Sequence, residues 1–426
     1  MPGAVEGLRV IDLTRQMAGP HATATLSDFG ADVIKVETLP FGDPSRRTGS
    51  DFIDGESALY LMWNRGKRSI AVDLRTREGV DLVRRLSSDA DVVVENFRPG
   101  VADDIGIGYS DLGSDNPRLI YCSISGFGPI GPMSSYPATD PVIQAMSGVM
   151  SVTGPADGDP VLAGIPIADL TGALLAVQGI LFALQARERT GRGQKVDVSL
   201  LFGLVSGLST RLATYWTTGE QPARFGSAHS VVVPYQTFRT ADGYGMAGVW
   251  GAGDWPRFCA AVGMPELAED PRFADNVARL ENREALIEIL GGVFPTRSTD
   301  EWAERFRAER ALFGPVLEFP DLFEHPHVQA ADIVTSVEHA TLGPVRQLRP
   351  PIVMSDTPGS VQSAPPILGQ HTEQVLGELG LTSDEIVSLV RRGVVALASQ
   401  RPATAVSGLA PRSDSPHLHE SDRQDE

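Results

Sequence analysis

The sequence predicts an α/β protein, with an open Rossmann-like parallel sheet in a large domain and a second, smaller α+β domain. Three observations predict this fold class. Short apolar runs alternate with helical segments over the first 200 residues, which is typical of a parallel sheet. The chain has 426 residues, more than one typical core needs. Composition changes at residues 218–234, where a Gly/Ser loop follows two apolar helices.

The predicted strands of the large domain are separated by helices or loops. They are residues 8–12, 32–37, 69–74, 90–95, 118–124 and 195–198. The predicted helices are residues 20–29, 77–86, 141–152, 170–188 and 199–216, with short helical turns within 99–115. An open sheet of this kind binds its ligands at the carboxyl ends of the strands. Those ends carry residues 14–20, 74–75, 96–100 and 125–128.

The second half of the chain predicts a hairpin and several short helices. A hairpin is expected at 235–249 around an Asp-Gly turn, followed by helices near 254–262, 281–293 and 299–309, strand-like segments in 335–350 and two helices in 372–392. The predicted organisation is a large α/β domain (1–218), a linker and small α+β domain (219–334) and a return to the large domain (335–398). Residues 399–426 hold few large apolar side chains, so we expect a disordered tail.

Composition and charge exclude several classes of function. The net charge of −18 argues against a nucleic-acid partner. Cys122 and Cys259 are the only cysteines, and the first residues show no secretory signal, so a cytoplasmic protein without a disulfide framework is expected. No Cys/His spacing fits a metal site. The apolar run 170–188 is short and interrupted by Gly and Gln, so no membrane span is expected.

The first strand–helix–strand unit also raises the alternative of a dinucleotide site. Glu37 ends the second strand, where an acid that binds a ribose would stand. The Gly-x-Gly-x-x-Gly pattern is absent from the first turn. We therefore expect no nicotinamide cofactor.

The segment 164–172 (GIPIADLTG) places one acid, Asp169, at the start of a long apolar helix. Asp169 can be read as an N-cap, whose carboxylate accepts hydrogen bonds from free N–H groups. It can also be read as a carboxylate nucleophile, because a helix N-terminus favours an anion. Gly164 and Gly172 would then leave room for a bulky ligand. The segment alone leaves both interpretations open.

Several longer motifs bear on this choice. They are LSDFGADVIKVE (26–37), NRGKRSIAVDL (64–74), VENFRPG (94–100), YCSISGFGPIGP (121–132), GRGQKVDVSL (191–200), GSAHSVVVPYQTF (226–238), HPHVQA (325–330) and LGQHT (368–372). In this order they resemble the family III CoA-transferases (CaiB/BaiF), which include formyl-CoA transferases and the related α-methylacyl-CoA racemases. The resemblance covers about residues 8–395. Segments 153–164, 226–238 and 368–372 are most similar to the succinyl-CoA:glutarate branch.

The resemblance implies an enzyme that moves CoA from an acyl-CoA, such as succinyl-CoA, to a free carboxylic acid, such as a dicarboxylate. Asp169 matches the catalytic aspartate, whose carboxylate forms a mixed anhydride and then an aspartyl-CoA thioester. CoA thioester is a substrate, and no permanently bound cofactor is expected. N–H groups of the helix past Asp169 and a glycine loop would stabilise the oxyanions. An interlocked homodimer is also implied.

The resemblance assigns further site residues. For CoA they are Ala18, Gly19, Leu74, Asn96, Phe97 and Arg98, with Lys67, Arg68 and Arg75 for the phosphates. For the substrate and a lid they are Thr139, Asp140, Gly226, Ser227 and His229. Met17 replaces the Gln of oxalate-type members, and Thr38 replaces an Arg that many members carry. Contacts to the adenosine phosphate are therefore expected to shift to Arg46 or Arg47.

Two alternatives to a transferase are weighed. A racemase-like epimerase of this family needs a His directly before the acid of segment 136–141, and Thr139 stands there. Thr139 cannot shuttle an α-proton, so Asp140 is left as a supporting acid or a helix cap. A non-catalytic CoA-binding protein is the other alternative, and the intact Asp169 argues against it.

Overall fold

The computed structural model describes residues 3–251 and 253–398. Its large domain is built on a seven-stranded sheet in which six adjacent strands run parallel and one edge strand, β14, runs antiparallel. The spatial order is β14 (Val395–Ala396), β5 (Lys67–Val72), β2 (Asp32–Thr38), β1 (Arg9–Asp12), β6 (Val92–Glu95), β7 (Ile120–Ser125) and β8 (Lys195–Ser199). The predicted α/β class is confirmed. The expected disordered tail, 399–426, lies outside the described residues.

Helices cover both faces of this sheet, which explains why its central strands are continuous apolar runs. One face packs against α3 (Arg77–Ser88), α4 (Val101–Asp104), α5 (Tyr109–Asp115), α17 (Thr372–Glu378) and α18 (Ser383–Arg391). The other face packs against α1 (Ala18–Asp28), α8 (Ile167–Thr190) and α9 (Leu200–Gly207). Helix α17, helix α18 and strand β14 come from the end of the chain, so the chain closes on its own first domain.

The strand order reverses beside β1. From β1 the chain moves outward to β2 and β5, then returns to β6 on the other side of β1 and continues to β7 and β8. The connections on the two sides of the β1/β6 boundary therefore diverge. In open α/β sheets this leaves a crevice outside the carboxyl ends of the two strands.

Several predicted elements have different bounds in the structure. Strand β5 begins two residues earlier than predicted and ends at Val72. The helix expected over 141–152 is two helices, α6 (Asp140–Met146) and α7 (Val149–Val152), separated by Gly148 at φ 90°. The helix expected over 199–216 is α9 and α10 (Ser209–Thr218). Apolar periodicity continues through both breaks, so the pattern does not reveal them.

The second domain contains a three-stranded antiparallel sheet with helices. The sheet order is β11 (Leu312–Pro315), β10 (Tyr244–Gly248) and β9 (Tyr235–Arg239), and the helices are α11 (Asp254–Val262), α12 (Asn276–Glu281), α13 (Arg283–Val293) and α14 (Thr299–Ala308). Its core is aromatic: Phe294 stacks on Phe238, and the buried Trp302 contacts both Phe294 and Phe306. The predicted α+β character is confirmed.

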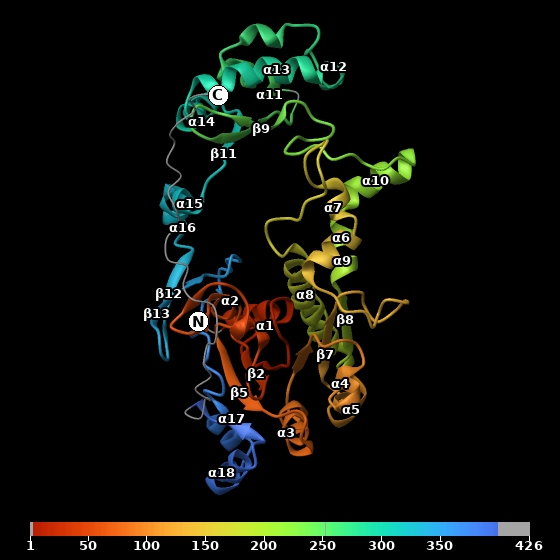
Figure 1. Ribbon diagram of the computed structural model, residues 1–426, viewed down its shortest axis with the longest axis vertical. Coiled ribbons are helices and arrows are strands. Elements are labelled where there is room, and N and C mark those ends of the chain that lie inside the picture. The colour runs from red at the N-terminus through yellow and green to blue at the C-terminus, as the bar shows by residue number, and fades with distance from the viewer. Residues whose placement is uncertain (1–2, 252, 399–426) are drawn as a thin grey trace, which may run out of the picture.

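Two separate arms join the two domains (Figure 1). The chain leaves the large domain through α10. It returns on the opposite side through α15 (Phe319–Glu324), α16 (Pro326–Ala331), β12 (Val334–His339) and β13 (Gly343–Leu348). The remaining short elements are α2 (Ala58–Trp63), β3 (Phe52–Ile53), β4 (Glu56–Ser57) and three 3-10 turns at Pro44–Arg47, Pro265–Ala268 and Phe294–Thr296.

Among the described residues, α8 is the one helix that is long and apolar enough to cross a membrane. A single such helix is weak evidence, because a core helix passes the same test. Ala173, Ala176 and Ile180 of α8 are buried in the core of the large domain. Leu174 and Phe182, on another side of the helix, are 54% and 73% exposed.

Candidate active site

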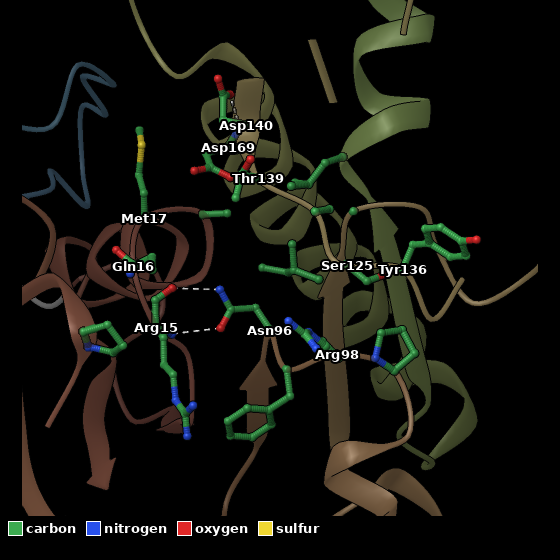
Figure 2. Close-up of a pocket in the computed structure, with 18 of the residues that line it drawn as sticks. Arg15, Gln16, Met17, Asn96, Arg98, Ser125, Tyr136, Thr139, Asp140 and Asp169 are labelled. Atoms are coloured by element: carbon green, nitrogen blue, oxygen red, sulfur yellow. Dashed lines mark hydrogen bonds between the residues drawn. The ribbon is translucent and has the colours of Figure 1, made fainter. Parts of the chain in front are cut away.

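A cavity of about 740 Å³ opens at the carboxyl ends of β1, β6 and β7. Its walls are the loops that follow these strands, the segment that leads into α6, and the first turn of α8 (Figure 2). The predicted site residues that line it are Ala18, Asn96, Phe97, Arg98, Thr139, Asp140 and Asp169. The fold therefore brings together side chains from four distant segments at the point where the strand order reverses.

Asp169 is the third residue of α8, and Pro166 is the N-cap. The prediction that Asp169 itself occupies the N-cap is wrong, because the helix begins earlier, at Ile167. The Asp169 side chain is half-buried and lines the cavity. Burial, with a smaller contribution from the charge of Asp140, raises the pKa of Asp169 to about 6. Near neutral pH the carboxylate is still mostly ionised, yet it is more basic than an ordinary one.

Asp140 caps the helix that carries Asp169. Its Oδ1 accepts hydrogen bonds from the backbone N–H groups of Ala168 at 2.7 Å and of Asp169 at 3.2 Å. Its Oδ2 accepts one from Gln144 Nε2 at 2.6 Å, and Gln144 Oε1 accepts one from the N–H of Ala163 at 3.0 Å. The cap that sequence reasoning allowed for Asp140 thus acts on α8 rather than on its own helix, α6.

The first-turn N–H groups of α8 are already engaged. Besides the two bonds to Asp140, the N–H of Ile167 bonds the carbonyl of Ile165 at 2.8 Å, and the N–H of Leu170 bonds that of Pro166 at 3.0 Å. The expectation that this helix terminus supplies oxyanion donors is therefore corrected. Gly172 is also not a space for ligand, because a Cβ there would lie 2.2 Å from the side chain of Leu200.

The N-terminus of α1 lies on the opposite wall. Met17 and Ala18 line the cavity, and Met17 lies across from Asp169 (Figure 2). The N–H groups of Ala18 and Gly19 precede the first intrahelical bond, which runs from His21 to Met17. Within the described part of the chain, neither N–H has a hydrogen-bond acceptor. Gly19 does not line the cavity; a Cβ there would lie 2.3 Å from Thr14 Cβ, so this glycine permits close packing.

The basic residues predicted for the CoA phosphates lie elsewhere. Lys67 is buried, and its ammonium donates hydrogen bonds to Asp12, Asn64 and the carbonyl of Pro20, each at 2.9 Å. Arg68 pairs with Asp32 and Glu378. Lys67 and Arg68 stand at the beginning of β5, whereas ligands bind at strand ends. Strand β5 is also separated from β1 by β2.

The other predicted CoA contacts on that side are also absent from the cavity lining. Leu74 is buried in the core of the large domain, and Arg75 pairs with Asp73. Arg46 is buried and forms an ion pair with Glu37 at 2.7 Å. Its guanidinium is therefore already paired with a protein carboxylate and is not available to a phosphate. Arg47 lies over the ring of Phe41.

The predicted lid residues belong to the loop before β9 and do not line the cavity. Ser227 Oγ lies 2.6 Å from Thr237 Oγ1, and the ring of His229 packs beside those of Tyr235 and Trp250. Gly226 has φ 59°. The single chain therefore holds this loop on the second domain, and a lid role for it stays a prediction.

Sequence reasoning missed Arg15 and Gln16, which line the cavity beside Met17. A usable signal existed, because both lie in the loop after β1, one of the strand ends where ligands were expected. Gln16 adopts φ 66°, and its N–H donates to Asp43 Oδ1 at 3.0 Å. Within residues 3–251 and 253–398, no group of three or more His, Cys, Asp or Glu side chains could hold a metal ion.

Comparison with known proteins identifies the family. Residues 5–372 match the family described as CoA-transferase family III. The chain is 39% identical over 393 residues to the succinyl-CoA:glutarate CoA-transferase of Mus musculus, covering 92% of this chain and 90% of that protein. It is 39% identical over 386 residues to the succinate–glutarate CoA-transferase of Agrobacterium fabrum, covering 88% and 95%.

A solved structure agrees with these relatives. The fold matches the crystal structure of a CaiB/BaiF family protein from Brucella suis with a TM-score of 0.80 and 38% identity, covering 89% of this chain and all of that one. The match covers most of both domains of this chain. In this chain the cavity lies where the strand order of the parallel sheet reverses. The chain therefore belongs to CoA-transferase family III and is a CoA-transferase.

Proposed function

We propose that this enzyme transfers CoA from succinyl-CoA, or a similar acyl-CoA, to a dicarboxylate through covalent intermediates on Asp169. The observation that carries this proposal is the position of Asp169, a carboxylate with a raised pKa that lines the switch-point cavity. The names of the relatives support the substrate class, because one pairs succinyl-CoA with glutarate and the other pairs succinate with glutarate.

The reaction needs four displacements and no net proton transfer. Asp169 Oδ attacks the thioester carbonyl carbon of the donor, the C–S bond breaks, and CoA leaves as the thiolate. The thiolate attacks the aspartyl carbonyl carbon of the mixed anhydride, which releases the donor acid as a carboxylate and leaves an aspartyl-CoA thioester. The acceptor carboxylate attacks this thioester, the thiolate leaves again, and a second anhydride forms. The thiolate then attacks the acceptor carbonyl carbon and frees Asp169.

The surroundings of Asp169 suit these steps. The raised pKa makes its oxygens better nucleophiles while most molecules stay ionised near neutral pH. Each displacement develops an oxyanion, and preorganised N–H donors stabilise such charge. The uncommitted donors on this side are the N–H group of Ala18, which lines the facing wall, and that of Gly19, the next residue of α1. We assign them this role in place of the first turn of α8.

The remaining predictions enter the same proposal. Asn96, Phe97, Arg98 and Ala18 bind CoA along one wall of the cavity. The CoA thioester is consumed as a substrate, and the reaction uses no permanently bound cofactor. The buried, unpaired thiols of Cys122 and Cys259 support a cytoplasmic location. The exposed Leu174, Phe182 and Phe202 of α8 and α9 support an interlocked homodimer that covers this apolar face.

The test is to trap the covalent intermediate. Incubation with succinyl-CoA alone should give an aspartyl-CoA adduct at Asp169, which hydroxylamine converts to a hydroxamate that peptide mass spectrometry locates. Asp169→Ala should give no adduct and no transfer to glutarate. Binding of CoA without an adduct from any donor, together with transfer activity in Asp169→Ala, would overturn the mechanism. Activity confined to monocarboxylate acceptors would overturn the substrate class.

A further inference from the structure

Two arginines, Arg15 and Arg98, are the cationic side chains that line the cavity. Arg98 is exposed, and Arg15 is half-buried. Within the described residues, neither guanidinium makes a hydrogen bond or an ion pair with a protein carboxylate. The other basic residues considered for the CoA phosphates are engaged elsewhere, as described above. Arg15 and Arg98 are therefore the positively charged side chains that an anionic ligand group in this cavity can meet.

The backbone of Arg15 is held on both sides by one carboxamide. The N–H of Arg15 donates to Asn96 Oδ1 at 2.8 Å, and Asn96 Nδ2 donates to the Arg15 carbonyl at 2.8 Å. The bond from the N–H of Gln16 to Asp43 fixes the next residue. The backbone that carries the Arg15 side chain is thus fixed by hydrogen bonds, and within the described residues the side chain itself has no ionic partner.

The aromatic ring beneath Arg15 is also fixed. The Arg15 guanidinium carbon lies 4.8 Å from the centroid of the Phe97 ring. The N–H of Phe97 donates to the buried Glu95 at 2.7 Å, and the other carboxylate oxygen of Glu95 accepts from Ser123. A guanidinium over an aromatic face keeps its donors at its edge, where they match a phosphate in a bidentate arrangement.

The side chain of Arg15 extends away from Asp169. In Figure 2, Asp169 lies near one end of the lined cavity, and the Arg15 guanidinium reaches the other end, beyond Asn96. A thioester at Asp169 places the acyl carbon and sulfur of the substrate at the first end. The part of CoA remote from its sulfur, the phosphorylated nucleotide, then extends toward the second end.

We infer that Arg15, stacked over Phe97 and aligned by Asn96, binds the phosphates of the CoA nucleotide. This rests on the proposed function for the placement of the thioester. It adds a binding residue on the loop after β1 and gives Asn96 a positioning role through the backbone of that loop.

The experiment compares full and truncated donors. Arg15→Gln should lower kcat/KM for succinyl-CoA about 10- to 100-fold, the range expected for losing a charged hydrogen bond. With succinyl-pantetheine, which lacks the nucleotide, the variant should match the wild type within about twofold, because the lost contact is absent from both. Arg391→Gln removes the same charge from an exposed site outside the cavity and should match the wild type on both donors.

Three results would overturn the inference. An equal loss on both donors would place Arg15 near the reacting atoms or in the folded framework. A loss of kcat/KM that is seen with dicarboxylate acceptors and absent with monocarboxylate acceptors would mean that Arg15 binds the second carboxylate of the acceptor instead. Calorimetry with CoA alone separates this inference from the proposed function, since Arg15→Gln should weaken CoA binding about 10-fold or more even if no transfer occurs. Unchanged CoA binding would also overturn it.

Discussion

Asp140 Oδ1 accepts a hydrogen bond from the backbone N–H of Asp169 at 3.2 Å, although the two residues are 29 positions apart. One acid therefore caps the helix that presents the other. The contact fixes the backbone of Asp169, and the charge of Asp140 adds to burial in raising the pKa of Asp169. Positioning and basicity of the proposed nucleophile thus depend on the same side chain.

Asp140→Asn should separate these two effects. Asn keeps an oxygen that caps α8 and removes the negative charge, so the pKa of Asp169 should fall from about 6 but stay above its ordinary value, because burial is the larger cause. Transfer needs ionised Asp169, so the acid limb of the kcat/KM profile should move to lower pH. Asp140→Ala should also lose the cap, which costs about 0.5–2 kcal/mol of stability. An unmoved acid limb in Asp140→Asn would contradict the electrostatic role.

Asp169→Asn should stabilise the fold at alkaline pH while abolishing transfer. The folded pKa lies above the ordinary value of 3.8, so ionisation of Asp169 penalises the native state increasingly as pH rises from about 4, and fully above about 6. A shift of this size corresponds to roughly 3 kcal/mol at about pH 8, and to a smaller gain at about pH 5. Urea unfolding at the two pH values measures the difference. A pH-independent gain would show that packing, rather than ionisation, limits stability here.

Glu95 should act on CoA through the loop that it holds. Glu95→Ala removes the acceptor for the N–H of Phe97 and should lower kcat/KM for succinyl-CoA about tenfold. Glu95→Gln keeps an acceptor for Phe97 and a partner for Ser123, so it should retain activity within about threefold of the wild type. Equal losses in the two variants would mean that the charge, not the hydrogen bonds, matters.

Lys67 should prove structural. Its ammonium is buried against Asp12, so Lys67→Met leaves that carboxylate with one fewer cation and should cost about 3 kcal/mol in unfolding free energy. The KM for succinyl-CoA should change by less than about threefold. A raised KM with unchanged stability would instead support the role in binding the CoA phosphates that the family resemblance implies for Lys67.

Much of the fold followed from local pattern. Alternating apolar strands and helices predicted the parallel sheet, and the Asp-Gly turn predicted the hairpin of the second domain. Helix ends were less accurate, because Asp140, which sets the start of α8, is remote in sequence. The breaks at Gly148 and after Gly207 fall inside continuous apolar patterns, so periodicity could not locate them.

For the site, the sequence by itself determined the family and, through the resemblance, singled out Asp169 as the proposed nucleophile, since ordered motifs and one acid near a helix start are local features. It also placed Asn96, Phe97 and Arg98 at a strand end. Only the tertiary structure decided which cations remain available. Lys67, Arg68 and Arg46 looked free in the sequence, but folding pairs each with a carboxylate from another segment. The ionic partner of each cation depends on strand order and burial, and neither can be predicted from the spacing of residues in the sequence.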